Sequence, residues 1–540
     1  MKKRPTIRTI LLLCVALFLT ACGMDNISLN PAGVPQALTP AGQAADDPAT
    51  EGTYDYYQQH VQMAAPAATA YSEDSGTLRL SMRHPLTLNP LLNEDVTVDR
   101  ILRLIFEPLI VLDENLRPSS HLAELEFTSD FSSVTVAIRN DAFWSDGTPV
   151  TADDLIFSVD VLRSAPANAI YRQNVANIAA VTRINSRTVQ MRFYHPSPMV
   201  GIDLGFPIIP RHHYQGQNMN RHSMAPLGNG PFLFESYTPM QNVALAQNPT
   251  SFRQLSQIQN IEVIFLPDAQ TELYAFDQGR IDAIYLPLTE WVRHHSVRHP
   301  GYEIFPAMYF EFIGFNHHND IFDNLHVRQG IAHAFNADEA IPAVYLTHAV
   351  RAVSPIHPNS FVAGGASALQ YDPGRARALL NAANITRPLA IIVNGDNPQR
   401  VSIGARLAAS LNAIGVPARM EALHYADYFT RLEDGDFDLF IGGMNLALTP
   451  DMSVFFTEQE GALFIANETL QASFDAIQNA ATQPDYLQAV SQFQQDFAAQ
   501  LPVISLAFRH SAVLTNRHIT QNHAPAPDNV FGWVNLWQVE

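Results

Sequence analysis

The sequence predicts an α/β fold with mixed sheets, divided into more than one packed unit. At 540 residues, the chain exceeds the roughly 100–200 residues of a usual domain. Apolar residues make up 47 % of the chain and charged residues 16 %, which is the composition of a globular protein. Stretches with the two-residue period of strands alternate with stretches of helical period, as they do in α/β proteins.

The first elements of this pattern lie between residues 77 and 161. Thr77–Met82 alternates between apolar and polar residues as a strand does, and Val134–Ile138 has the same period. Between them, Ile101–Leu109 is apolar with helical spacing. Thr151 stands three residues before Asp154 and an apolar run follows, so this pair predicts a helix start with a capping-box-like arrangement.

The alternation continues in the second half of the chain. Val401–Ala413 carries apolar residues along one helical stripe, and Gly415 is a natural end for that helix. Val416–Ala422 then alternates as a strand. Phe437–Ile441 is a short apolar run of the buried-strand type, which we expect to end at Gly442–Gly443.

The N-terminus has the features of an export signal. Four basic residues precede the apolar run Ile10–Leu19, which suits the h-region of a signal peptide and is short for a membrane span. Leu19–Cys22 follows at once and resembles the lipobox of bacterial lipoproteins, in which the cysteine receives a diacylglyceryl group. We therefore predict a signal peptide over residues 1–21 and lipidation of Cys22. An ordinary secretory signal with an incidental cysteine is the alternative.

Residues 22–73 predict a flexible tether between this anchor and the folded body. Prolines are scattered among Ala, Gly, Gln, Asn and Asp, and no hydrophobic periodicity is present. Such a segment cannot bury enough apolar surface to fold alone.

Composition excludes several classes of function. With 52 acidic and 32 basic residues, the net charge of −20 disfavours nucleic acid as a partner. Cys14 and Cys22 are the only cysteines, so the body has none for a disulfide, a thiolate metal cluster or a nucleophile. Lysine occurs only at Lys2 and Lys3, which excludes P-loop and Schiff-base chemistry. The nucleophile-elbow, zinc-protease and dinucleotide motifs are also missing, whereas spacing alone leaves open a glycosidase pair of carboxylates.

Eight segments of the body occur in an order that is typical of one family. The most specific is Ala142–Leu155, with the sequence AFWSDGTPVTADDL. The other seven, in chain order, are Phe106–Leu109, Leu227–Phe232 with Gln247–Pro249, Gly279–Asp282, Phe315–Asn316 with Val327–Ile331, Tyr371–Leu380, Gly435–Asp438, and Leu501–Ile504. Together they resemble the family-5 extracellular solute-binding proteins of ABC transporters, the oligopeptide-, dipeptide- and nickel-binding type.

This resemblance implies a bilobal, periplasmic-binding-protein-like fold of type II, cluster C. Lobe one would comprise residues 74–286, with an extra subdomain near 110–225, and lobe two would comprise 287–503. Residues 504–540 would return to complete lobe one. The family binds its ligand between the two lobes.

The same resemblance implies the substrate-binding component of an ABC importer, and we therefore predict that the protein is not an enzyme. The two lobes would close on a hinge over an oligopeptide or similar small solute and deliver it to permease and ATPase subunits. We expect a monomer without a cofactor, anchored by lipid on the extracytoplasmic face of the bacterial membrane. Two alternatives remain. One is a receptor for a non-peptide solute, such as an oligosaccharide, an opine-like compound or a metal chelate. The other is a lipoprotein that signals or scaffolds without transport.

One loop departs from the family pattern. In the peptide-binding members, an aspartate in lobe two pairs with the amino terminus of the ligand. The corresponding stretch here is Gly442–Asp451, in which Met444 replaces the usual tryptophan and Leu446–Ala447 fall at the place of the aspartate. Asp451 could serve only if the loop is shifted, and Asp396 is another carboxylate that could replace it. The departure favours a more apolar ligand, or one without a cationic head.

The resemblance places the ligand cleft at loops that follow strand ends. The candidate cleft residues are Thr87, Leu88, Asn89, Trp144, Asn229, His357, Asn394, Asp396, Met444 and Asn445. Arg351 and Arg400 are the candidates to bind a carboxylate of the ligand. The alternative role of Trp144 is packing against the neighbouring helix.

The 20 histidines raise the question of a metal site. His295 and His299 have the H-x-x-x-H spacing, but Arg293 and Arg298 crowd them with positive charge, which disfavours a cation. Adjacent histidines elsewhere point in different directions on a strand or a helix. We therefore predict no metal site.

Overall fold

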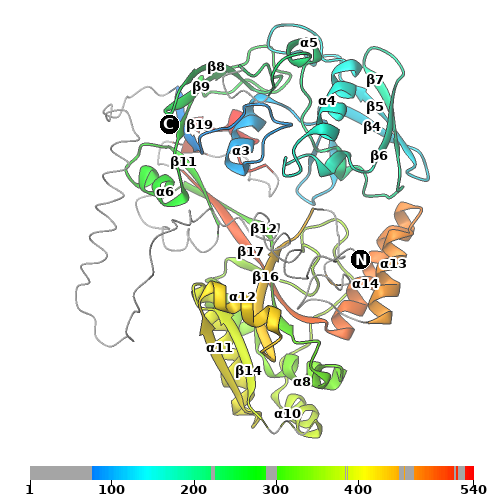
Figure 1. Ribbon diagram of the computed structural model, residues 1–540, viewed down its shortest axis with the longest axis vertical. Coiled ribbons are helices and arrows are strands. Elements are labelled where there is room, and N and C mark those ends of the chain that lie inside the picture. The colour runs from blue at the N-terminus through cyan, green and yellow to red at the C-terminus, as the bar shows by residue number, and fades with distance from the viewer. Residues whose placement is uncertain are drawn as a thin grey trace, which may run out of the picture.

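Two lobes, joined by long strands, make up the folded body (Figure 1). The computed structural model describes residues 76–219, 225–287, 301–383, 385, 387–448, 455, 467–515, 519–520 and 529–539. The signal peptide, Cys22, the tether and His295 lie outside this set. Within it, no helix is both long enough and apolar enough to cross a membrane.

The upper lobe of Figure 1 contains two four-stranded sheets. The first has the order β1 (Thr77–Met82), β10 (Asn260–Phe265), β9 (Asn242–Gln247) and β8 (Phe232–Thr238). The second has the order β4 (Ala123–Phe127), β5 (Ser133–Ile138), β7 (Thr188–Phe193) and β6 (Ile178–Arg183). The helices and short strands of this lobe are α3 (Val96–Ile105), β2 (Ile110–Leu112), β3 (Pro118–Ser120), α4 (Ala152–Ser164), α5 (Arg211–Tyr214), α6 (Ala269–Asp277), and the pair β18 (Ile519–Thr520) and β19 (Gln538–Val539).

Local sequence signals account for the helix starts in this lobe. Helix α3 begins five residues before the predicted apolar stretch, because the Asp95 side chain accepts hydrogen bonds from the backbone N–H groups of Thr97 and Val98. Helix α4 begins after Thr151 as predicted. The Asp154 carboxylate accepts hydrogen bonds from both the backbone N–H and the hydroxyl of Thr151, each at 2.8 Å. The strand over Thr77–Met82 is also confirmed.

The lower lobe is built on a seven-stranded sheet, of which the first edge strand lies in the upper lobe (Figure 1). Its order is β11 (Ala283–Leu286), β17 (Val503–Thr515), β12 (Gly301–Phe315), β16 (Leu439–Asn445), β14 (Leu389–Asn394) and β15 (Ala418–Leu423), and β13 (Ala349–Arg351) pairs with β17. Its helices are α8 (Leu325–Ala334), α9 (Ala337–Tyr345), α10 (Pro373–Ala382), α11 (Pro398–Ala413), α12 (Tyr425–Asp434), α13 (Glu468–Gln478) and α14 (Gln483–Gln500). The helix and strand predicted around Gly415 are confirmed as α11 and β15.

The expectation that β16 ends at its two glycines is wrong. The strand continues through Gly442 and Gly443 to Asn445 and pairs with β12 along that length. A Cβ atom at Gly443 would lie 2.5 Å from the Arg400 guanidinium and 2.6 Å from the Tyr309 ring. The glycines are therefore required by close packing against the strand, and they do not end it.

Strands β12 and β17 connect the two lobes (Figure 1). One end of β12 pairs with the part of β17 that also pairs with β11, and the other end lies between β17 and β16. The register shifts between Pro306 and Phe310, and again between Glu311 and Phe312. The ladder is thus irregular midway between the lobes, where a bend disturbs few hydrogen bonds. The predicted lobe boundaries remain predictions.

A buried ion network lies at this irregular point. Glu311 is 1 % exposed, and its carboxylate accepts a hydrogen bond from Arg400 Nε of α11 at 3.1 Å. Its other oxygen lies 3.4 Å from Arg509 Nε of β17. The Arg509 guanidinium stacks 3.8 Å from the Tyr309 ring centroid, and Arg400 donates to the Tyr309 hydroxyl at 2.9 Å. Burial on its own would lower the pKa of Arg400, but the charge and hydrogen bond of Glu311, together with the nearby Tyr309 and Tyr428, outweigh burial and raise this pKa. The network ties α11 to both crossing strands.

We expect Glu311→Gln to lower the free energy of unfolding by about 3–5 kcal/mol, because it leaves two buried guanidinium groups without a counter-charge. Denaturant unfolding of the full chain at pH 7, followed by tryptophan fluorescence, measures the change. Glu303→Gln is the matched control on the same strand. Burial raises the pKa of Glu303, so loss of its charge should leave stability unchanged or slightly higher. Equal destabilisation by both substitutions would contradict a special role for the network.

Candidate ligand-binding site between the two lobes

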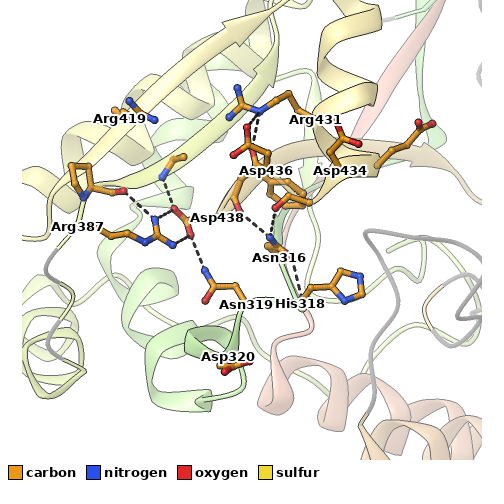
Figure 2. A pocket seen from close by; sticks show the side chains of 15 residues that line it. Asn316, His318, Asn319, Asp320, Arg387, Arg419, Arg431, Asp434, Asp436 and Asp438 are labelled. Carbon is orange, nitrogen blue, oxygen red and sulfur yellow. Dashed lines mark hydrogen bonds and ion pairs between the residues drawn. The ribbon is translucent and has the colours of Figure 1, made fainter.

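A cavity of about 880 Å³ lies where β12 ends and where β14 and β16 begin (Figure 2). Its central charge is already paired. Asp438 accepts hydrogen bonds from Arg387 at 2.6 Å and 2.5 Å, from Asn319 at 2.9 Å and from the Ala390 backbone at 2.8 Å. This end of β12 lies away from the irregular stretch at which β12 and β17 connect the lobes. We interpret the cavity as a polar hollow of the lower lobe.

A smaller cavity, of about 300 Å³, is lined by residues from both lobes. The upper lobe contributes residues of α3, of β2, of the short helix η1 (Gln173–Val175) and of η2 (Ile202–Leu204), together with residues next to these two short helices. The chain after β16 contributes Ala447 and Leu448. Much of the wall is apolar, including Ile110, Leu112 and Ile202. A concave, largely apolar space with a few polar groups is the usual form of a small-molecule site.

The lobes also touch beside this cavity. The Phe361 N–H donates a hydrogen bond to the Asn115 carbonyl at 2.8 Å, and the Arg117 guanidinium lies 4.9 Å from the centroid of the Phe361 ring. Phe361 belongs to the chain that follows β13, whereas Asn115 and Arg117 lie between β2 and β3. A ligand in the cavity would therefore be enclosed by contacts from both sides.

Asp203 is the charged residue of the cavity without a partner. Its side chain is half-buried in η2 and forms no hydrogen bond or ion pair with any described residue. Burial raises the pKa of this carboxyl from 3.8 to about 6. Sequence analysis did not single out Asp203. The signal that could have found it is a lone carboxylate inside the apolar run 199–204.

None of the predicted cleft residues lines this cavity, and their roles in binding remain predictions. Three of them form a buried turn after β1. The Thr87 hydroxyl donates to the Met219 carbonyl at 3.2 Å and accepts from the Asn89 N–H at 3.1 Å, while Leu88 is 3 % exposed. Asn229 accepts from the Glu107 N–H at 3.0 Å. The amide nitrogens of Asn89 and Asn229 are buried without a partner among the described residues.

Trp144 and His357 are both buried. Trp144 is 0 % exposed and donates to Asp154 at 3.3 Å, which favours its packing role. His357 packs against Phe508 with ring centroids 5.0 Å apart. Its Nδ1 accepts from the Asn359 N–H at 3.2 Å, and its buried Nε2 has no partner in the described chain. Burial, together with the charge of His510, lowers the pKa of His357 to about 4.

Four of the predicted cleft residues lie at the ends of β14 and β16. The Asn394 side chain accepts from the Asp396 N–H at 3.0 Å, and Asp396 accepts from the Tyr425 N–H at 3.2 Å. The Asp396 side chain is 58 % exposed. Met444 is half-buried against the core, and Asn445 is exposed. The alternative carboxylate, Asp451, lies outside the described residues.

The two predicted carboxylate-binding arginines are engaged within the protein. Arg351 Nη1 donates to the carbonyls of Ala352 and Leu506, at 2.7 Å and 2.8 Å. Arg400 is paired with Glu311, 89 residues away in sequence. The pairing of Arg400 with Glu311 could not be predicted from local sequence, because the two residues lie far apart along the chain.

Metal binding gains no support from the described part of the chain. There, no group of three or more His, Asp or Glu residues is placed to hold an ion. The His212 ring contacts Asp146 at 2.8 Å, and the His317 ring contacts the Pro502 carbonyl at 2.8 Å. Both histidine rings form hydrogen bonds within the protein.

Comparison with known proteins gives the chain its family. The model of bacterial extracellular solute-binding proteins, family 5 (middle), matches residues 117–461, which is more than half of the chain. An ABC transporter peptide-binding protein of Brucella ovis is 27 % identical over 327 residues, covering 58 % of this chain and 62 % of that protein. Di/tripeptide-binding protein 2 of Pseudomonas aeruginosa is 24 % identical over 359 residues, covering 61 % of this chain and 66 % of that protein. The chain thus spans less than two thirds of the length of these relatives.

The fold has solved counterparts as well. The ABC transporter substrate-binding protein CtaP of Listeria monocytogenes superposes with a TM-score of 0.73 at 18 % identity, covering 86 % of this chain and 100 % of that one. This likeness confirms the predicted two-lobed α/β fold class. The ordered motifs, the two lobes and the family match agree, and the chain belongs to the bacterial extracellular solute-binding proteins, family 5.

Proposed function

We propose that this protein is the lipid-anchored substrate-binding component of an ABC importer, and that it captures a peptide or a related small solute. The observation that carries the proposal is the cavity to which both lobes contribute, beside strands with an irregular ladder. The relatives named as peptide-binding and di/tripeptide-binding proteins favour a peptide over the other solutes. The signal peptide would direct export, and the lipid on Cys22 would hold the protein at the outer face of the cytoplasmic membrane, where it would deliver its ligand to a permease.

Binding would proceed by closure of the two lobes. A ligand that contacts both walls of the cavity binds the closed state more tightly than the open state, so it shifts the population toward closure. The irregular ladder of β12 and β17 can bend while the sheets on either side keep their pairing.

Native mass spectrometry of the full chain, purified from membranes without denaturation, tests the ligand class. We expect a spread of adducts that releases short peptides when the protein is unfolded, because ligands buried between lobes dissociate slowly. Adducts of one discrete non-peptide compound would contradict peptide capture.

We expect Arg117→Ala to weaken peptide binding about two- to fivefold, because it removes a cation–π contact between the lobes that is worth about 0.5–1 kcal/mol. Calorimetric titration with a peptide released from the wild-type protein measures the affinity. Arg187→Ala is the control, since Arg187 lies 6.0 Å from the Phe143 ring within the upper lobe. Unchanged affinity in Arg117→Ala would argue against stabilisation of the bound state by this contact.

Cys22→Ser should release the protein from the membrane fraction, because the multiple acyl chains that would provide stable attachment could no longer be added. Fractionation of cells followed by immunoblotting measures the distribution. Retention of the variant in the membrane would contradict the lipoprotein assignment.

A further inference from the structure

One carboxylate of the interlobe cavity has no counter-charge among the described residues. Among its lining residues, Arg103 and Asp203 are the two that are charged at neutral pH. Arg103 is already neutralised, because its Nε lies 2.9 Å from the carboxylate of Asp99, which also accepts from the Tyr171 hydroxyl at 2.8 Å. The other residues that β2, η1, η2 and the chain after β16 contribute to the cavity are uncharged. Asp203 therefore contributes a negative charge that no described side chain offsets.

The surroundings of Asp203 make that charge costly. Its backbone carbonyl accepts from the Asn174 side chain at 2.9 Å, but its carboxylate receives no donor from the described chain. Burial is the cause that raises its pKa to about 6, whereas partnered acids such as Asp438 receive several donors. A half-buried carboxylate without a partner is therefore able to bind a cationic group from solution.

We propose that Asp203 binds an ammonium group of the solute, and this inference rests on the proposed peptide-binding function. An ammonium group suits the site because it is compact, donates three hydrogen bonds and brings one positive charge to one carboxylate. A metal ion would need further ligands, and the described residues hold no such group. The upper lobe would thus supply the carboxylate that Leu446–Ala447 lack in the lower lobe, and the expected preference for ligands without a cationic head would be reversed.

The test uses the full chain in detergent and three tripeptide libraries whose side chains are uncharged, except for one lysine in the third library. One library has a free amino terminus, one is N-acetylated, and one is N-acetylated but contains a single lysine. Binding is measured by competition at pH 7 for the wild type, Asp203→Asn, Asp396→Asn and the exposed control Asp160→Asn, whose side chain is 64 % exposed.

We expect the wild type to bind a library that carries an ammonium group, and Asp203→Asn to bind it about 10- to 100-fold more weakly, as for loss of a charge-assisted hydrogen bond. The library that binds tells whether the ammonium group is the amino terminus or a lysine. Affinity of the wild type should also fall about tenfold per pH unit below about pH 6, because the carboxyl must be ionised to bind, and this dependence should be absent in Asp203→Asn.

Several outcomes would overturn the inference while leaving the proposed function intact. They are equal wild-type binding of the acetylated library without lysine, an affinity in Asp203→Asn within twofold of wild type, and a loss confined to Asp396→Asn. Failure of the wild type to bind any of the libraries would overturn the peptide function and the inference together. Because Asp203 makes no side-chain hydrogen bond in the described chain, Asp203→Asn should melt at or above the wild-type temperature, which separates a binding defect from misfolding.

Discussion

The contact of Glu311 with Arg400 and Arg509 is the interaction on which the arrangement of the two lobes depends. Each buried charge loses hydration worth several kcal/mol, and this loss is tolerated only where opposite charges and hydrogen bonds replace water. Here the carboxylate joins a helix of the lower lobe to the two strands that enter from the upper lobe. The joint is therefore held by side chains at the place where backbone pairing is irregular, and each sheet stays intact on its own side.

Asp203, unlike Glu311, is partly buried without an opposite charge among the described residues. Its raised pKa means that the folded state binds a proton more tightly than the unfolded chain. Its contribution to stability is therefore largest at low pH and declines as the pH rises from about 4 through about 6. Folding alone gives no reason to keep an ionised group in such a position. Local conflicts of this kind are expected where a sequence serves function. In the polar hollow of Figure 2, by contrast, Asp438 is fully partnered.

Sequence reasoning succeeded where the cause of a structure is local. The strand at Thr77–Met82 and the start of α4 follow from short-range patterning and capping, and they occur as predicted. It failed at Gly442–Gly443, where the need for glycine comes largely from Arg400, Tyr309 and Phe312 in distant segments. The cavity was missed for the same reason, because it is assembled from α3, β2, η1, η2 and the chain after β16. Of the residues singled out, only the loop with Ala447 reaches it.

The proposed closure of the lobes would be coupled to the charge of Asp203. In an open form, Asp203 would be exposed to more water, so its ionised state would cost less. Closing the lobes without a ligand would desolvate that charge with no compensation, which favours the open form. A cationic group in the cavity would remove this penalty, and its charge-assisted hydrogen bond would be stronger in the closed form, where less water competes for the carboxylate. Differential affinity of this kind is what a ligand needs in order to shift a two-state equilibrium. An exposed carboxylate such as Asp396 could not act in this way, because water screens it in both forms.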